Sequence, residues 1–179
     1  MTAQSFTICP TGGGVGAFVE GLDLTGEISA ETTEGLKRSL GEHGVLFFRQ
    51  QHLSPEQHIA FAQGFAPINI NRFFTPVADY PMIAEVRKEP DQKKNIGGGW
   101  HTDHSYDLDP AMGSILLARE TPPKGGDTMF ANQYIAYETL SDGMKQLLDG
   151  LNAVHDDTHV AGPKSKKNKT RTNKVRDDP

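Results

Sequence analysis

The spacing of apolar side chains predicts two helices early in the chain. Leu36 and Leu40 are four residues apart, which places both on one face of a helix that Ser29 can cap. A second helix is expected after Ser54, because a proline follows it and Gln57 stands three residues later, the pattern of a capping box. The apolar positions beyond Gln57 predict a face that packs against a core.

Short apolar runs predict strands between and after these helices. Residues 45–48 are bounded by a glycine and a charge, as is typical of a buried strand. Residues 83–87 alternate apolar and polar side chains, which favours a half-buried strand. Residues 115–118 predict another buried strand, which the later proline pair would end.

The pattern becomes helical again over residues 132–151. Ser141 can cap the second of two helices in this interval. The apolar face of that helix comprises Met144, Leu147, Leu148 and Leu151. We expect core packing to account for these side chains, with no cofactor needed to explain them.

Composition narrows the class of protein. A chain of 179 residues suits one domain, and its net charge of -5 argues against a general nucleic-acid binder. The single cysteine, Cys9, excludes a disulfide framework and a cysteine-based zinc site, and it favours a reducing compartment. No apolar run approaches the roughly 20 residues of a membrane helix, and no secretory signal is evident. We therefore expect a cytoplasmic protein with neither nucleic acid nor membrane as a partner.

The main chemical motif follows a glycine run and contains His101 and Asp103. If the backbone is extended, side chains two positions apart point the same way. An imidazole and a carboxylate suit a divalent ion, and two histidines with one carboxylate are the ligands of non-haem Fe(II) oxygenases. The motif therefore predicts two thirds of a metal site, whose third ligand must come from elsewhere in the chain.

A second motif, Pro-Pro-Lys-Gly-Gly-Asp-Thr, occupies residues 122–128. Together with residues 44–49, 100–103 and 136–141, it resembles the TauD/TfdA (taurine dioxygenase) family of Fe(II)- and 2-oxoglutarate-dependent oxygenases. The resemblance implies an α+β fold over residues 1–160. That fold would be the front part of a double-stranded β-helix (a jelly roll of the clavaminate synthase type) with flanking helices.

The resemblance also implies a function. His101 and Asp103 match the first two iron ligands of the family, and Thr128 matches the threonine that hydrogen-bonds the 2-oxoglutarate carboxylate. The implied reaction hydroxylates a small organic substrate of the sulfonate or carboxylate class with O2, and it releases succinate and CO2. The distal histidine and the 2-oxoglutarate-binding arginine of the family are expected beyond residue 179.

Three positions align loosely with the substrate pocket of the taurine enzymes, namely Asn71, Phe74 and Gly97. The taurine enzymes carry other side chains there, which argues against taurine itself as the substrate. The segment around Asn71 and Phe74 could equally form an ordinary loop or a pocket wall. The glycines before His101 would leave space above the metal for a bulkier ligand or a mobile loop.

The end of the chain differs in composition. Residues 161–179 are basic and nearly devoid of apolar side chains, so we expect a mobile tail or a truncated active-site loop. His159, followed twelve residues later by Arg171, is an alternative third ligand. We disfavour His159, because the helices expected after Thr128 leave too few strands to carry it back to the metal. His104 could support the metal site or be a surface residue, and we favour the surface residue.

Two other functions remain open. The chain could be a truncated, catalytically inactive fragment of such an oxygenase with at most a binding role. It could also be a zinc hydrolase that uses His101, Asp103 and His104, although adjacent ligands should point apart on an extended strand. A jelly roll without its later strands would expose sheet edges, which favours pairing into a homo-oligomer.

Overall fold

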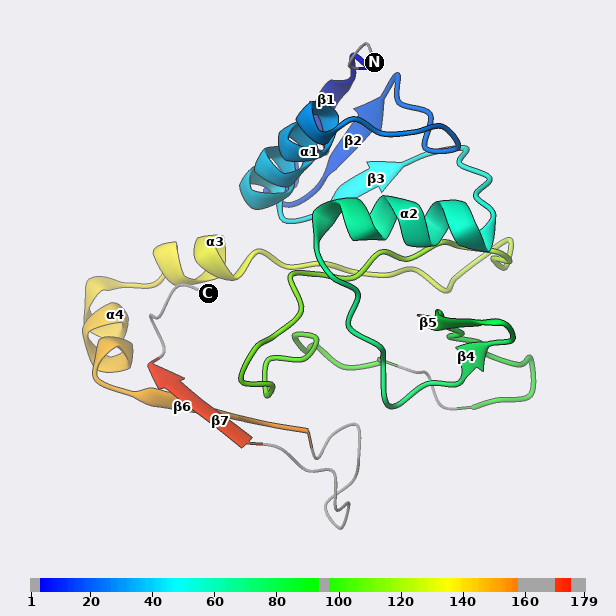
Figure 1. The fold of residues 1–179 in the computed structure, drawn as a ribbon. Coiled ribbons are helices and arrows are strands. Elements are labelled where there is room, and N and C mark those ends of the chain that lie inside the picture. The colour runs from blue at the N-terminus through cyan, green and yellow to red at the C-terminus, as the bar shows by residue number, and fades with distance from the viewer. Residues whose placement is uncertain (1–3, 94–96, 158–169, 175–179) are drawn as a thin grey trace. The chain divides into compact units, whose positions relative to one another are not determined.

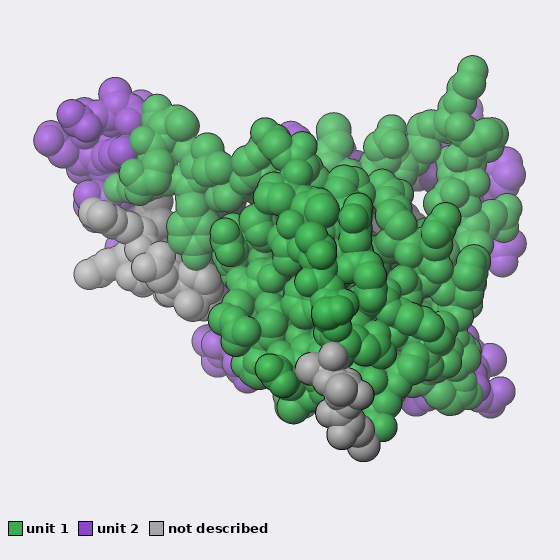
Figure 2. Space-filling view, turned by 90° about the horizontal axis from the view of Figure 1, so that it is seen from above, with its two compact units in different colours: residues 1–68, 115–139 green, residues 69–114, 140–179 purple. Residues whose placement is uncertain are grey.

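The computed structural model of the protein describes residues 4–93, 97–157 and 170–174. The chain forms two compact units (Figure 2). The first comprises residues 1–68 and 115–139, and the second comprises residues 69–114 and 140–179. The chain therefore passes from the first unit to the second, back to the first, and then to the second again.

A three-stranded sheet forms the first unit's framework. Its strands are β1 (Thr7–Pro10), β2 (Ala17–Glu20) and β3 (Leu46–Phe48), in the order β1-β2-β3 (Figure 1). β1 and β2 are antiparallel, with Ile8 opposite Val19, whereas β2 and β3 are parallel. A parallel pair needs a crossover connection, and α1 (Ala30–His43) supplies it. β3 thus confirms the strand predicted near residues 45–48.

Both predicted helices of this unit are present, with the caps that the sequence indicates. α1 begins after Ser29, whose side chain accepts a hydrogen bond from the backbone N–H of Thr32. It ends at Gly44, whose φ of 72° is left-handed and suits glycine. α2 (Pro55–Phe65) begins with the complete capping box of Ser54 and Gln57. Local hydrogen bonding therefore determines where these helices start.

The core of the first unit lies between the sheet and the two helices. Leu36 of α1 is completely buried there, and Phe61 of α2 stacks edge to face on Phe48 of β3, with ring centroids 5.7 Å apart. The buried cluster consists of Val19, Leu22, Leu24, Leu36, Leu53 and Phe61. One face of each helix therefore packs as the apolar spacing predicts.

Replacing Ser54 by alanine should lower the free energy of unfolding by about 1 kcal/mol, because the change removes the acceptor for the Gln57 N–H. The measurement is a urea titration followed by circular dichroism. Ser39→Ala is the matched control, since the Ser39 hydroxyl only bonds back to the Gly35 carbonyl inside α1. Equal effects of the two changes would contradict the capping role of Ser54.

The second unit has little regular structure. It contains the pair β4 (Pro76–Val77) and β5 (Tyr80–Ala84), the helix α4 (Asp142–Asp149), and the pair β6 (Asn152–Asp156) and β7 (Thr170–Lys174). α4 has the predicted Ser141 cap. β7 replaces the expected mobile chain for residues 170–174. The other residues of 161–179 lie outside the described residues, so the expected domain boundary at residue 160 stays a prediction.

Three predictions of local structure need correction. Residues 115–118 form no strand, and Leu116 is 73% exposed, because no other segment of the described chain pairs with them. The strand expected at residues 83–87 lies at 80–84. α4 buries none of its residues, and Leu147 is 60% exposed, so core packing does not explain its apolar face.

The described residues have the mixed α and β content that was predicted. Their strands form one three-stranded and two two-stranded sheets, and α3 (Gln133–Glu138) is the remaining helix. Among these residues no helix is both long enough and apolar enough to cross a membrane.

Candidate metal-binding site

His101 and Asp103 lie in the second unit, on the long irregular segment that follows β5. His101 Nε2 is 3.3 Å from Asp103 Oδ1, so the two side chains converge. Neither residue belongs to a paired strand, and a turn begins at Asp103. The convergence therefore comes from loop geometry rather than from the alternation of side chains along a strand.

Each side chain of this pair is also held by a second hydrogen bond. His101 Nδ1 lies 2.8 Å from the Gly99 carbonyl oxygen, and because a carbonyl can only accept, Nδ1 carries the proton. Nε2 is then the ring nitrogen that faces Asp103. The Ser114 hydroxyl donates to Asp103 Oδ2 over 3.2 Å. Bonds of this kind orient the ligands of a metal ion and fix the tautomer of a histidine.

The pair fits a divalent metal ion. Two ligand atoms that each lie about 2.1 Å from an ion, at a right angle, are about 3 Å apart, close to the observed separation. Among residues 4–93, 97–157 and 170–174, no three His, Cys, Asp or Glu side chains are grouped closely enough to hold an ion. His159, the disfavoured alternative, lies outside the described residues. The pair would thus supply two ligands, and its binding of a metal ion stays a prediction.

Gly97 stands beside the imidazole of His101. Its φ is 67°, and an added Cβ would lie only 3.3 Å from His101 Cε1. Both the backbone conformation and the lack of space favour glycine here. The structure thus provides a steric reason for this glycine, whereas its contact with a substrate stays a prediction.

Thr128 belongs to the first unit, whereas His101 and Asp103 belong to the second. It is exposed and follows Gly125 and Gly126, which have φ values of 75° and 76°. These left-handed residues form the predicted tight turn before Thr128. A contact between Thr128 and a keto acid at the metal pair stays a prediction.

Asn71 and Phe74 form part of a tight turn. Asn71 Oδ1 accepts hydrogen bonds from the N–H groups of Phe73 and Phe74, over 2.8 and 3.1 Å. This side-chain-to-backbone turn is a common role of asparagine. It occupies the amide oxygen of Asn71, while Phe74 is half-buried. Their contact with a substrate remains a prediction.

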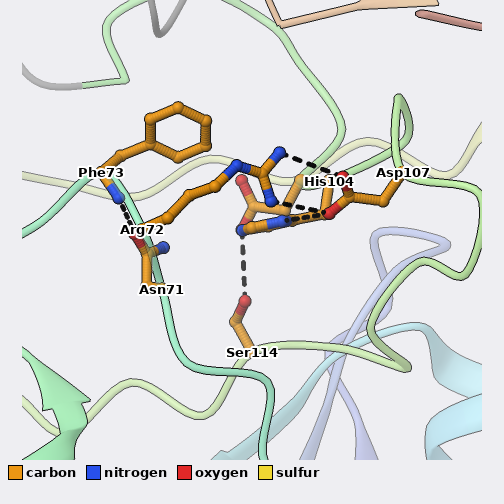
Figure 3. A network of polar contacts seen from close by, with 7 residues as sticks. Asn71, Arg72, Phe73, His104, Asp107 and Ser114 are labelled. Carbon is orange, nitrogen blue, oxygen red and sulfur yellow. Dashed lines mark hydrogen bonds and ion pairs between the residues drawn. The ribbon is translucent and has the colours of Figure 1, made fainter. Parts of the chain in front are cut away.

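The structure contains a polar cluster that the sequence did not reveal (Figure 3). The guanidinium of Arg72 donates two hydrogen bonds to the carboxylate of Asp107, over 3.2 and 3.0 Å. His104 Nδ1 lies 3.0 Å from Asp107 Oδ2, and its side chain is only 15% exposed. The preferred interpretation of His104 as a surface residue is therefore wrong, because its imidazole bonds to the buried carboxylate of Asp107. The spacing of three between His104 and Asp107 was the available signal.

The surroundings of this cluster stabilise its protonated groups. Hydrogen bonding to Asp107 raises the pKa of Arg72 above its ordinary value. Burial raises the pKa of the Tyr106 phenol, because desolvation disfavours the phenolate. At neutral pH the guanidinium cation of Arg72 therefore lies beside the neutral phenol ring of Tyr106.

Two proteins of known name are similar to this chain in sequence. An alkylsulfatase of Acinetobacter baylyi is 36% identical over 156 residues, which cover 85% of this chain and 48% of the relative. An alpha-ketoglutarate-dependent 2,4-dichlorophenoxyacetate dioxygenase of Cupriavidus pinatubonensis is 34% identical over 155 residues, which cover 78% of this chain and 54% of the relative.

Solved structures also match. The crystal structure of a taurine dioxygenase from Burkholderia xenovorans has a TM-score of 0.78 at 31% identity, covering 96% of this chain and 58% of that chain. This chain spans about half the length of the two curated relatives. The model of the family described as "Taurine catabolism dioxygenase TauD, TfdA family" matches residues 7–179. The chain belongs to this family.

Proposed function

We propose that this protein acts as an Fe(II)- and 2-oxoglutarate-dependent dioxygenase that hydroxylates a small organic substrate and releases succinate and CO2. The observation that carries the proposal is the convergence of His101 Nε2 and Asp103 Oδ1, 3.3 Å apart, in a chain of this family. A neutral imidazole and a carboxylate are suitable ligands for a non-haem Fe(II) centre. The jelly roll of the resemblance belongs to the same proposal.

His101 and Asp103 would hold the ion, together with a third ligand from outside the described residues. Bound Fe(II) would supply the redox chemistry that couples oxidative decarboxylation of 2-oxoglutarate to hydroxylation by O2. The Gly99 carbonyl keeps the Nδ1 proton of His101 in place, so that Nε2 presents its lone pair on the side of Asp103. Thr128 would donate a hydrogen bond from its hydroxyl to the keto-acid carboxylate, which would help to orient that ligand.

The substrate is proposed to be a small organic anion. The matched relatives are named for an alkyl sulfate, a phenoxyacetate and taurine, and these compounds share a sulfate, carboxylate or sulfonate group. Asn71, Phe74 and Gly97 would border the pocket, with the half-buried Phe74 ring as an apolar wall. The expected cytoplasmic location and homo-oligomer are part of this proposal and rest on the sequence alone.

Anaerobic titration with Fe(II) and 2-oxoglutarate tests the proposal. The chain should develop the visible charge-transfer band of an iron-bound keto acid, and Asp103→Asn should weaken it because the amide loses the anionic charge that binds the ion. Asp109→Asn is the matched control, since Asp109 is an exposed carboxylate of the same loop. A wild-type chain that binds Fe(II) without the band would contradict the proposal and favour the zinc-type or inactive alternatives.

A further inference from the structure

Arg72, His104 and Asp107 form a three-residue cluster in the second unit, which we call the Asp107 clamp (Figure 3). Asp107 is 4% exposed, and its two carboxylate oxygens accept hydrogen bonds from both terminal nitrogens of Arg72. A buried carboxylate is costly unless it is paired and hydrogen-bonded. The fork-to-fork geometry meets this requirement and also fixes the relative orientation of the two groups.

Aromatic rings flank the guanidinium of the clamp. Arg72 Cζ lies 4.7 Å from the centroid of the Phe73 ring and 5.4 Å from that of Tyr106. Tyr106 is itself buried. Rings over a guanidinium face attract the cation and limit the access of water, which strengthens the ion pair with Asp107.

The clamp also constrains the backbone beside the His101–Asp103 pair. His104 directly follows Asp103 and has a φ of 55°, an uncommon conformation for a residue with a side chain. The Asp107 N–H donates to the His104 carbonyl over 2.9 Å, while the Asp107 carboxylate holds the imidazole. Asp107 therefore fixes both the main chain and the side chain of the residue next to Asp103.

The clamp also joins two segments that are distant in sequence. Asn71 shapes the tight turn that carries Arg72, and Arg72 reaches across 35 sequence positions to Asp107. The segment proposed to border the substrate is thereby tied to the loop that carries His101 and Asp103. From this geometry we infer that Arg72 and Asp107 are positioning residues that orient the His101–Asp103 pair before a metal ion binds.

Metal affinity tests the inference, which rests on the proposed function. Mn(II) binding to the full chain, followed by electron paramagnetic resonance, should weaken about tenfold in Asp107→Asn and in Arg72→Lys, as expected for groups that support metal ligands. Because Arg72 and Asp107 form one hydrogen-bonded pair, the Mn(II) affinity of the double variant should fall little further than that of either single variant. Arg87→Lys and Glu89→Gln are the controls, since this exposed ion pair in the same unit should leave affinity unchanged.

Amide hydrogen exchange in the metal-free protein provides a second readout. Exchange of the Asp107 amide and its neighbours in residues 101–107 should accelerate in both clamp variants and stay unchanged in the controls. Should Asp107→Asn fail to fold, Arg72→Lys, which keeps the charge, carries both measurements. Unchanged exchange or unchanged Mn(II) affinity in a folded clamp variant would overturn the inference. A wild-type chain that binds no Mn(II) would instead overturn the proposed function, and exchange alone would then decide whether the clamp orders the loop.

Discussion

Replacing His101 by alanine should reduce Mn(II) or Fe(II) affinity by more than about 100-fold, beyond the effect of losing a group that merely supports a ligand. The imidazole provides one of the two ligand atoms that converge at 3.3 Å, and the other belongs to Asp103. In the His101→Ala variant, the Asp103 carboxylate would be the remaining metal ligand of the pair. The measurement is calorimetric or spectroscopic titration of the metal under anaerobic conditions.

The control for this change is His52→Ala. His52 is an exposed histidine of the first unit, so its loss should leave the affinity of the His101–Asp103 pair unaltered. Circular dichroism should be the same for both variants, because the His101 side chain is itself more than a third exposed. Metal affinity that survives His101→Ala would exclude this pair as the binding site.

Replacing Leu36 by alanine should lower the free energy of unfolding by about 3 kcal/mol, the range seen when a buried leucine is truncated. Leu36 has no exposed surface and packs in the cluster that joins α1 to the sheet and to α2. The loss combines the transfer free energy of the removed methyl groups with the cavity that they leave. Urea denaturation followed by far-ultraviolet circular dichroism gives the difference.

Leu108→Ala provides the matched comparison for Leu36, because Leu108 is 88% exposed and has little burial to lose. Its free energy of unfolding should stay within about 0.5 kcal/mol of the wild-type value. A Leu36→Ala variant that is equally unaffected would mean that α1 does not cover the sheet through this face.

Helix starts were predictable from the sequence. Ser29, Ser54 and Ser141 each accept a hydrogen bond from a backbone N–H three residues later. Such bonds form within one turn of chain, so their partners are visible in a short stretch of sequence. The same reasoning explains the left-handed Gly44 at the end of α1.

Predictions that needed a distant partner were less successful. The apolar run at residues 115–118 indicated a strand, and the apolar face of α4 indicated core packing. Periodicity shows which side chains can be buried together, but burial requires a second surface. In the described chain neither segment is fully covered. Leu116 and Leu147 stay exposed, whereas Leu117 packs partly buried against the core of the first unit.

The candidate site divides in the same way. His101 and Asp103 were recognisable because they are two residues apart and have complementary ligand chemistry. Arg72 was overlooked, since no local pattern connects it with Asp107. His104 was misjudged although Asp107 is only three residues away, because the burial of both side chains also depends on the distant Arg72.

By itself, the sequence determined the helix caps, the apolar face of α1, the pair of metal-ligand candidates and the resemblance to the family. These features depend on residues within a few positions of one another or on motifs read in order. Only the tertiary structure decided which apolar faces are covered, how the loop turns the His101 and Asp103 side chains together, and that Arg72 holds Asp107. Such contacts depend on the path of the chain between distant positions, which local hydrogen bonding and periodicity do not specify.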